Sequence, residues 1–199
     1  MIKRILIIIY FLLTIVPSGF SQFLKFGQPA PEIKMESMLR GEPGNLDLLK
    51  GIQGKVVVLD FWTTWCSPCI KAFPHLNNLV QTFEKEPVVF LAISNEEAEL
   101  VTALLDRKKL ESWVGLDTDL SIFKAYNAWA IPKTVVIDKD GNLAAVLHPT
   151  DLSEPLIRLL LAGKKLNSNN FKDGAYHDPV GAERQFRKMG SLKTRNQGG

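Results

Sequence analysis

The stretch Lys55-Val-Val-Val-Leu-Asp-Phe-Trp-Thr-Thr-Trp-Cys-Ser-Pro-Cys69 decides the fold. Residues 55–61 are nearly all β-branched or apolar and follow a glycine, a pattern typical of a strand buried on both faces of a sheet. From residue 67 to residue 85 the apolar side chains recur at steps of three and four, which predicts a helix. Cys66 and Cys69 therefore lie where a buried strand gives way to a helix.

The places of the two cysteines at this junction predict different roles for them. Cys66 falls at the N-terminus of the helix, where unpaired backbone N–H groups and the helix dipole stabilise a thiolate. Cys69 lies one turn inside the helix, close enough to form a disulfide with Cys66 but shielded from external attack. We expect Cys66 to be the nucleophile and Cys69 to be the resolving thiol.

A structural disulfide and a zinc site are the other uses of such a pair. The chain has no further cysteine, and His75, His148 and His177 do not stand at metal-ligand spacing, so we expect no metal. A disulfide that closes so short a loop constrains the unfolded chain little. The pattern therefore favours a redox-active Cys66–Cys69 pair that works without another cofactor.

Strand and helix patterns alternate through the rest of the chain. Buried-strand patterns occur at 88–93, 113–116, 133–138 and 142–147, with Lys139-Asp140-Gly141 as a hairpin signal between the last two. Helix patterns occur at 96–109, at 117–126, and from Asp151 or Ser153 to about residue 162. This order predicts the α/β class, with a three-layer α/β/α arrangement around a mixed sheet.

Composition divides the chain into four segments. Residues 1–21 place Lys3 and Arg4 before an apolar run, which predicts a signal peptide cleaved before Gln22 or, uncleaved, an N-terminal anchor. Residues 22–54 are expected to form an irregular lead-in and residues 55–163 the folded domain. Residues 164–199 have the composition of a basic, disordered tail. The protein is therefore expected to be exported.

Charge is unevenly distributed along these segments. Residues 164–199 hold eight basic and three acidic side chains, whereas residues 22–163 hold 14 basic and 18 acidic ones. Because the basic excess of the mature chain lies in the tail, the net charge of +3 is no sign of a nucleic-acid-binding fold. The sequence also contains no phosphate-binding loop and no Ser-His-Asp arrangement.

These motifs resemble the thioredoxin-fold proteins of the exported TlpA-like thiol:disulfide interchange family. The resemblance covers residues 28–163 and rests on four motifs: residues 58–69, Pro74, Ala130-Ile-Pro132, and Val136-Ile-Asp-Lys-Asp-Gly141. The segment between residue 85 and Pro132 has an extra helix and strand, as in TlpA-like proteins and peroxiredoxin relatives. The resemblance implies a thioredoxin fold with an inserted helix-strand element.

The resemblance also implies three further site residues. Pro132 corresponds to the cis-proline of the family, and the backbone of Ile131 is expected to pair with an extended substrate chain. Asp60 falls where thioredoxins keep a buried acid beneath the second cysteine. Because burial raises the pKa of a carboxyl, Asp60 is expected to take the proton from Cys69. The alternative is a strand residue that is bonded only to backbone.

Other residues near the motif have two interpretations. Lys133 stands where the family usually has Thr, and either its charge favours the thiolate or its side chain points to solvent. Glu97 resembles in position an acid of cytochrome-maturation reductases, but among neighbouring acids it also fits a solvated helix start. We expect Trp65 on the substrate contact surface and Trp62 in the core.

The predicted function is an exported protein-disulfide reductase that acts, as a monomer, on protein thiol and disulfide substrates. The TlpA-like pattern implies a periplasmic enzyme, which would need electrons from a membrane thiol transporter because the periplasm is kept oxidising. The alternatives are a disulfide-donating oxidase, a peroxiredoxin-like peroxide reductase, and a client-binding module without turnover. The Trp-Cys-x-x-Cys setting disfavours the peroxide reductase, and the retention of both thiols disfavours the client-binding module.

Overall fold

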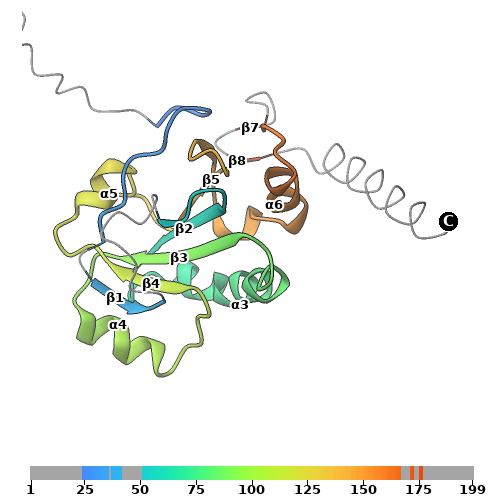
Figure 1. Ribbon diagram of the computed structural model, residues 1–199. Coiled ribbons are helices and arrows are strands. Elements are labelled where there is room, and N and C mark those ends of the chain that lie inside the picture. The colour runs from blue at the N-terminus through green and yellow to red at the C-terminus, as the bar shows by residue number, and fades with distance from the viewer. Residues whose placement is uncertain (1–23, 36, 42–50, 167–170, 173–174, 177–199) are drawn as a thin grey trace, which may run out of the picture.

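A six-stranded mixed sheet forms the middle of the fold (Figure 1). This computed structural model describes residues 24–35, 37–41, 51–166, 171–172 and 175–176, so the predicted signal peptide lies outside the described residues. In spatial order the strands are β1 (Ser37–Arg40), β4 (Trp113–Leu116), β3 (Val88–Ser94), β2 (Val56–Trp62), β5 (Lys133–Ile137) and β6 (Leu143–Leu147). β2 runs parallel to β3 and antiparallel to β5, inside the sheet.

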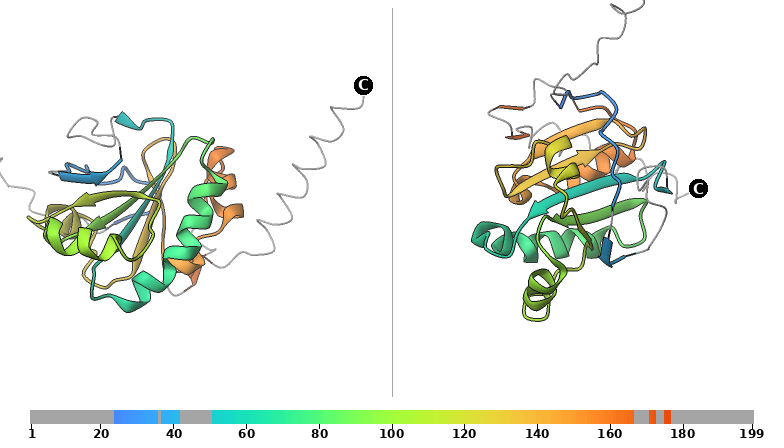
Figure 2. Two further views of the ribbon diagram at one scale, coloured as in Figure 1. Left: turned by 90° about the horizontal axis from the view of Figure 1, so that it is seen from below. Right: turned by 90° about the vertical axis from the view of Figure 1, so that its left-hand side faces the viewer.

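Helices cover both faces of this sheet (Figure 2). α3 (Ser67–Thr82), α4 (Ala98–Leu105) and α6 (Glu154–Leu161) pack on one face, and α5 (Ser121–Ala125) packs on the other. A 3-10 turn, η1 (Pro149–Asp151), precedes α6. The predicted three-layer α/β/α class is thereby confirmed, and α4 and β4 lie in the segment that was expected to be inserted.

All seven residues of β2 are buried, as the apolar pattern predicted. Val57 and Phe61 pack with α5 in one core cluster, whereas Val58 and Trp62 face the side of α3. Because side chains alternate along a strand, Asp60 also lies on the side of α3. β2 thus places the Asp60 carboxyl group in the same layer as the two cysteines.

The N-terminal segment takes part in the fold more than its sequence indicated. Within the predicted lead-in, residues 22–54, β1 pairs antiparallel with β4 and forms one edge of the sheet. Ile33 and Met35 are buried in the same core cluster as β2. The expected boundary at residue 55 therefore runs through a single hydrophobic core. The sequence indicates a turn at Gly41-Glu-Pro-Gly44 between possible short strands, but a strand of four residues does not show that it pairs with β4.

Three helices are shorter than their sequence patterns predicted, and the first of them, α3, ends at Thr82 rather than at residue 85. α4 ends at Leu105 rather than at residue 109, because residues 106–109 are all charged and offer no apolar side chain to bury. α5 begins at Ser121 rather than at residue 117. The carboxylate of Asp117 accepts the backbone N–H groups of Ile122 and Phe123, so this residue caps the helix from the preceding loop.

The C-terminal part contains one predicted hairpin and one that was not predicted. β5 and β6 pair antiparallel as expected, and Gly141 takes a φ of 82° in the turn between them. Within the predicted tail, residues 164–199, β7 (Phe171–Lys172) and β8 (Ala175–Tyr176) pair antiparallel. No helix among the described residues is long and apolar enough to cross a membrane.

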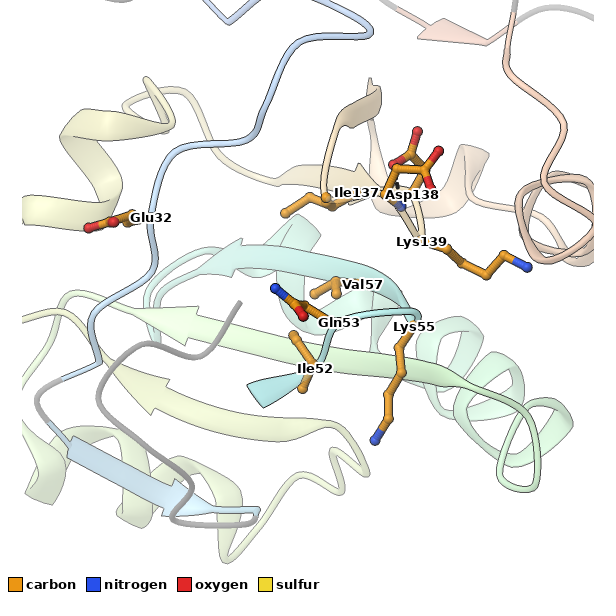
Figure 3. Close-up of a pocket in the computed structure, with 10 residues that line it drawn as sticks. Glu32, Ile52, Gln53, Lys55, Val57, Ile137, Asp138 and Lys139 are labelled. Atoms are coloured by element: carbon orange, nitrogen blue, oxygen red, sulfur yellow. Dashed lines mark hydrogen bonds between the residues drawn. The ribbon is translucent and has the colours of Figure 1, made fainter. Parts of the chain in front are cut away.

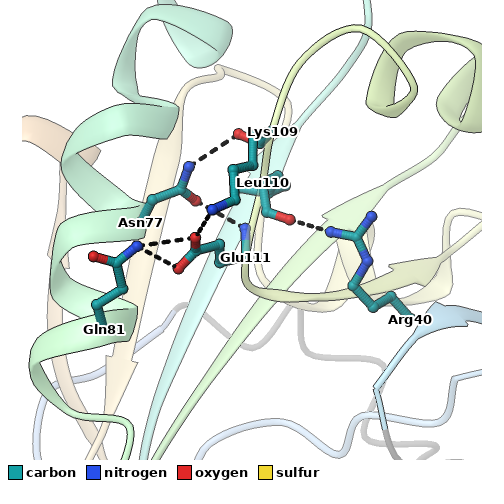
Figure 4. A network of polar contacts seen from close by, with 6 residues as sticks. All are labelled: Arg40, Asn77, Gln81, Lys109, Leu110 and Glu111. Atoms are coloured by element: carbon teal, nitrogen blue, oxygen red, sulfur yellow. Dashed lines mark hydrogen bonds and ion pairs between the residues drawn. The ribbon is translucent and has the colours of Figure 1, made fainter.

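A polar network holds the loop after α4 against α3 and β1 (Figure 4). The Asn77 side chain donates to the carbonyl of Lys109 at 3.0 Å and accepts the N–H of Glu111 at 2.8 Å. The Arg40 guanidinium donates to the carbonyl of Leu110. These bonds hold the Leu110 side chain in the core cluster that contains both cysteines.

Replacing Asn77 tests this network. Asn77→Ala is expected to lower the free energy of unfolding by about 2 kcal/mol, because two backbone groups lose their hydrogen-bond partner in a half-buried loop. Asn78 is exposed on the same helix, and Asn78→Ala is expected to change the free energy by less than about 0.5 kcal/mol. Urea unfolding measures both variants, and equal losses would contradict the assigned role of Asn77.

Candidate active site

The two cysteines form a disulfide at the start of α3, with a Cα–Cα distance of 5.3 Å. Cys66 is the N-cap residue of the helix, and its Sγ accepts the backbone N–H of Cys69 at 3.3 Å. Pro68 lies in the first helical turn, where its missing N–H leaves no hydrogen bond unmade. The helix N-terminus is thus arranged to stabilise negative charge on Cys66 once the disulfide is reduced.

Exposure separates the two sulfur-bearing residues. Cys66 retains 4% of its surface, whereas Cys69 retains none. The little surface that the pair exposes belongs to Cys66, so an incoming sulfur would meet Cys66 rather than Cys69. The order of reaction expected from the sequence, in which Cys66 acts first, stays a prediction.

Asp60 is a buried carboxyl group in the same layer. It is 3% exposed, its Oδ1 accepts the hydroxyl of Thr134 at 2.9 Å, and its Oδ2 has no partner among the described residues. Burial raises the pKa of Asp60 to about 7, and the hydrogen bond from Thr134 opposes that rise. At neutral pH this side chain can both accept and release a proton.

The loop before β5 lies beside the disulfide. The Ile131–Pro132 peptide bond is cis, as the resemblance implied. The side chain of Ile131 packs against the core cluster that contains Cys66 and Cys69. Phe61, near the end of β2, pairs with Lys133 at the start of the antiparallel strand β5. The loop that carries the cysteines and the loop that carries Pro132 therefore lie at the same end of the sheet.

Lys133 makes a contact that neither of its two interpretations described. Its Nζ donates to the carbonyls of Tyr126 and Asn127, at 2.9 Å and 2.8 Å, at the end of α5. Burial of the ammonium lowers the pKa of Lys133. The side chain therefore ties the start of β5 to the segment that leads into Pro132.

The acid that touches the cysteine loop is Glu96, not Glu97. The Glu96 carboxylate accepts the backbone N–H of Thr64 at 2.5 Å and its hydroxyl at 2.7 Å. Glu97 is exposed and only begins α4, without a capping hydrogen bond from its side chain. The sequence did hold a signal for Glu96: β2 and β3 are parallel, so residues just after them meet at one edge of the sheet.

Tryptophans occupy both the interior and the surface of the site. Trp62 is fully buried and packs edge-to-face on Phe73, with 5.2 Å between the ring centres, whereas Trp65 is 73% exposed. A second exposed tryptophan, Trp129, was not selected from the sequence and lies three residues before Pro132. Its surroundings in sequence, a short loop with Asn and Pro, gave no sign that its ring is in water.

A cavity of about 350 Å³ lies at the opposite end of the sheet (Figure 3). It is lined by residues before and at the start of β2, including Ile52 and Lys55, and by residues at and after the end of β5, including Asp138 and Lys139. The disulfide follows the other end of β2, so this cavity is not part of the cysteine site. The described residues contain no group of three or more His, Cys, Asp or Glu that could hold a metal ion.

Fold and site together define a thiol-disulfide oxidoreductase: a thioredoxin-like sheet that presents a Cys-x-x-Cys disulfide at a helix N-terminus. Comparison with known proteins gives the family. The chain belongs to the AhpC/TSA family, whose model matches residues 26–146.

Relatives and solved structures agree with this assignment. The thiol-disulfide oxidoreductase ResA of Geobacillus kaustophilus is 31% identical over 135 residues, which cover 67% of this chain and 75% of ResA. A Chlorobium tepidum protein assigned as thiol:disulfide interchange protein DsbE is 26% identical and has a TM-score of 0.58, covering 70% of this chain and 98% of that one. A Bacteroides vulgatus structure assigned as a thiol-disulfide oxidoreductase is 29% identical, with the same TM-score and coverages of 70% and 96%. The resemblance to thiol:disulfide interchange proteins is confirmed.

The raised pKa of Asp60 predicts a pH-dependent stability. The folded protein binds this proton more tightly than the unfolded chain, so the stabilisation is complete below about pH 4 and is lost as pH rises through about 7. We expect Asp60→Asn to gain stability relative to the wild type between these limits, by roughly 4 kcal/mol at most. Urea unfolding of the oxidised proteins from pH 4 to 8 measures the difference.

The control for this change is Asp140→Asn, which also removes one carboxylate but at an exposed turn position. Its stability is expected to follow the wild type at every pH. If the Asp60→Asn and wild-type profiles run parallel, burial of Asp60 does not govern its ionisation.

Glu96 and Glu97 form a matched pair of substitutions. Glu96→Ala is expected to lower the free energy of unfolding by about 2 kcal/mol, because a charged acceptor of two Thr64 hydrogen bonds is lost. Glu97→Ala is expected to stay within about 0.5 kcal/mol of the wild type. Hydrogen exchange should show faster exchange of the Thr64 amide in Glu96→Ala only, and unchanged exchange there would contradict the contact.

Proposed function

We propose that the protein reduces disulfide bonds in exported protein substrates. The observation that carries this proposal is the unequal access to the two sulfurs: Cys66 is reachable at the helix N-terminus, and Cys69 is buried behind it. Such a pair allows a mixed disulfide to form at one sulfur only and to be resolved from within the protein. Asp60 supplies a group that can move a proton in the same layer.

The proposed reaction begins with the reduced pair. The Cys66 thiolate attacks one sulfur of the substrate disulfide, the substrate S–S bond breaks, and the released substrate sulfur takes up from solvent the proton that Cys66 lost on ionising. Cys69 gives its proton to Asp60 and attacks Cys66 Sγ, and the second substrate sulfur leaves with that proton. The substrate gains two electrons and two protons, and the enzyme is left with the Cys66–Cys69 disulfide.

The loop before β5 has a binding role in this proposal. The Ile131 backbone, next to Pro132, pairs with an extended substrate segment and brings its sulfur to Cys66. Two observations support this role: the side chain of Ile131 contacts the cysteine cluster, and Lys133 bonds the loop to the end of α5. Trp65 borders the same approach to Cys66, with most of its ring in water.

The proposal places the enzyme in the periplasm as a monomer. Residues 1–21 support export, because they have the charged and apolar regions of a signal peptide. Each turnover leaves the enzyme oxidised, so a dithiol donor must return two electrons to it, and a membrane thiol transporter is the partner of that class. The disulfide is itself the redox group, so the proposal requires no other cofactor.

The dithiol reaction is tested by trapping its intermediate. Cys69→Ser removes the resolving sulfur, so the mixed disulfide between Cys66 and the substrate should accumulate in cells that produce this variant. Non-reducing electrophoresis followed by mass spectrometry would detect the trapped substrates. Cys66→Ser is the matched control and should trap none, and an absence of adducts in both variants would oppose the mechanism.

The direction of the reaction is tested on the wild-type protein, residues 22–199. Equilibration with glutathione or dithiothreitol should give a reduction potential near or below about −250 mV, in the thioredoxin range. A potential above about −150 mV would instead identify a disulfide donor, which uses the same two cysteines in reverse.

A further inference from the structure

Two exposed tryptophans lie close in sequence to the reacting groups. Trp65 directly precedes Cys66, and Trp129 comes three residues before Pro132. They retain 73% and 58% of their surface, and tryptophan is otherwise among the residues most strongly buried on average. The large apolar residues exposed in the described part of the chain are Phe26, Trp65, Leu100, Leu120 and Trp129. The two rings are therefore prominent among its exposed apolar groups.

The loop that carries Trp129 is held firmly on both sides. Ala128 is buried, and its N–H donates to the carbonyl of Phe123 at 2.8 Å. On the other side, Lys133 bonds to the carbonyls of Tyr126 and Asn127, and Ile131 packs on the cysteine cluster. A fixed loop that leaves an indole in water presents this ring to a partner rather than to its own core.

The segments that carry the two tryptophans have no charged side chain of their own, and the charged residues that border them are the buried Asp60, the exposed Lys71 and the backbone-bonded Lys133. Residues 61–70 and 127–132 contain no Asp, Glu, Lys or Arg. Of the acids near them, Asp60 is buried and Glu96 is bonded to Thr64. The side chains that these segments themselves expose are aromatic rather than charged, and this favours selection of a substrate by apolar contact over selection by charge.

We propose that Trp129, together with Trp65, selects substrates that carry a large apolar or aromatic side chain close to the reacting cysteine. The proposal rests on the proposed function and names its substrate class: extended protein segments with exposed apolar residues, rather than small charged thiols. As such a segment pairs beside Ile131, a neighbouring side chain covers the Trp129 ring. Trp129 is then a specificity-determining residue, and Lys133 is the positioning residue that holds its loop.

The test compares two peptide disulfides of equal charge. They differ only in whether Phe or Ser stands two residues from the cysteine, and quenching with an alkylating agent gives the rate of their reaction with the reduced protein. The wild type is expected to react about tenfold faster with the Phe peptide, because apolar surface is buried in the complex. Trp129→Ala should reduce this ratio to about twofold or less, and Trp129→Phe should keep most of it.

Leu100→Ala is the matched control, since it removes another exposed apolar side chain but from α4. It should keep the tenfold ratio. Raising the salt concentration from about 0.02 M to about 0.5 M should also leave the ratio unchanged, because screening weakens only charge-based selection. A wild-type ratio near one, a full ratio in Trp129→Ala, or a ratio that collapses in high salt would each overturn the proposal.

The same ratio can be measured in the reverse direction, with the oxidised protein and the two reduced peptides. A protein that oxidises peptides but does not reduce them would overturn the proposed direction of the reaction. The ratio between the Phe and Ser peptides would still be read from the oxidation rates. A result that contradicts the proposed reductase activity can therefore be distinguished from one that contradicts the proposed role of Trp129.

Discussion

The rest of the structure depends on the burial of β2 between two neighbouring strands. All of its residues are buried, and it pairs with β3 on one side and with β5 on the other. The chain therefore leaves the sheet at a fixed point and enters α3 through the short turn at residues 63–66, so that Cys66 becomes the cap of this helix. The same two pairings set the places of Glu96, which follows β3, and of Pro132, which precedes β5. The groups around the disulfide come from three segments of the chain, and one strand sets their spacing.

The last part of this strand stabilises the fold less than its burial suggests. Asp60 Oδ2, Trp62 Nε1 and Thr63 Oγ1 are buried without a hydrogen-bond partner among the described residues. Each such group lowers stability by about 1–3 kcal/mol relative to a satisfied one. They cluster at the end of β2 that leads to the cysteines, whereas the earlier residues of the strand are purely apolar. The apolar first half of β2 therefore stabilises the fold, whereas its last residues hold polar groups close to the cysteines. Among these, the buried Asp60 carboxyl has a pKa of about 7 and can exchange a proton.

Local sequence patterns predicted much of this arrangement. The buried strand, the helix that starts after Cys66, and the hairpin of β5 and β6 each have a strong periodicity or turn signal. Glu96 and Trp129 were missed for a different reason, because their surroundings depend on pairings between distant segments. Glu96 reaches Thr64 only because β3 lies beside β2, and the exposure of Trp129 follows from the way that Ala128 and Lys133 fix its loop. β1 could be read only as a possible short strand, because four residues carry too little pattern to show that they pair with β4.

In the proposed reaction, different parts of the site carry out the sulfur chemistry and the selection of the substrate. The sulfur chemistry needs the helix N-terminus and the buried acid, which the strand and the helix provide through backbone geometry that tolerates little change. The loop from residue 127 to residue 132 makes no backbone pairing within the sheet, so its side chains can vary without moving Cys66. It still has to be rigid, because a mobile loop would lose conformational entropy on each encounter with a substrate. Lys133 meets that need with two hydrogen bonds to the end of α5, in a position where the family usually has a shorter Thr. In the proposed reaction, a lysine at this position acts on substrate binding by fixing the loop, although its ammonium is bonded only to backbone.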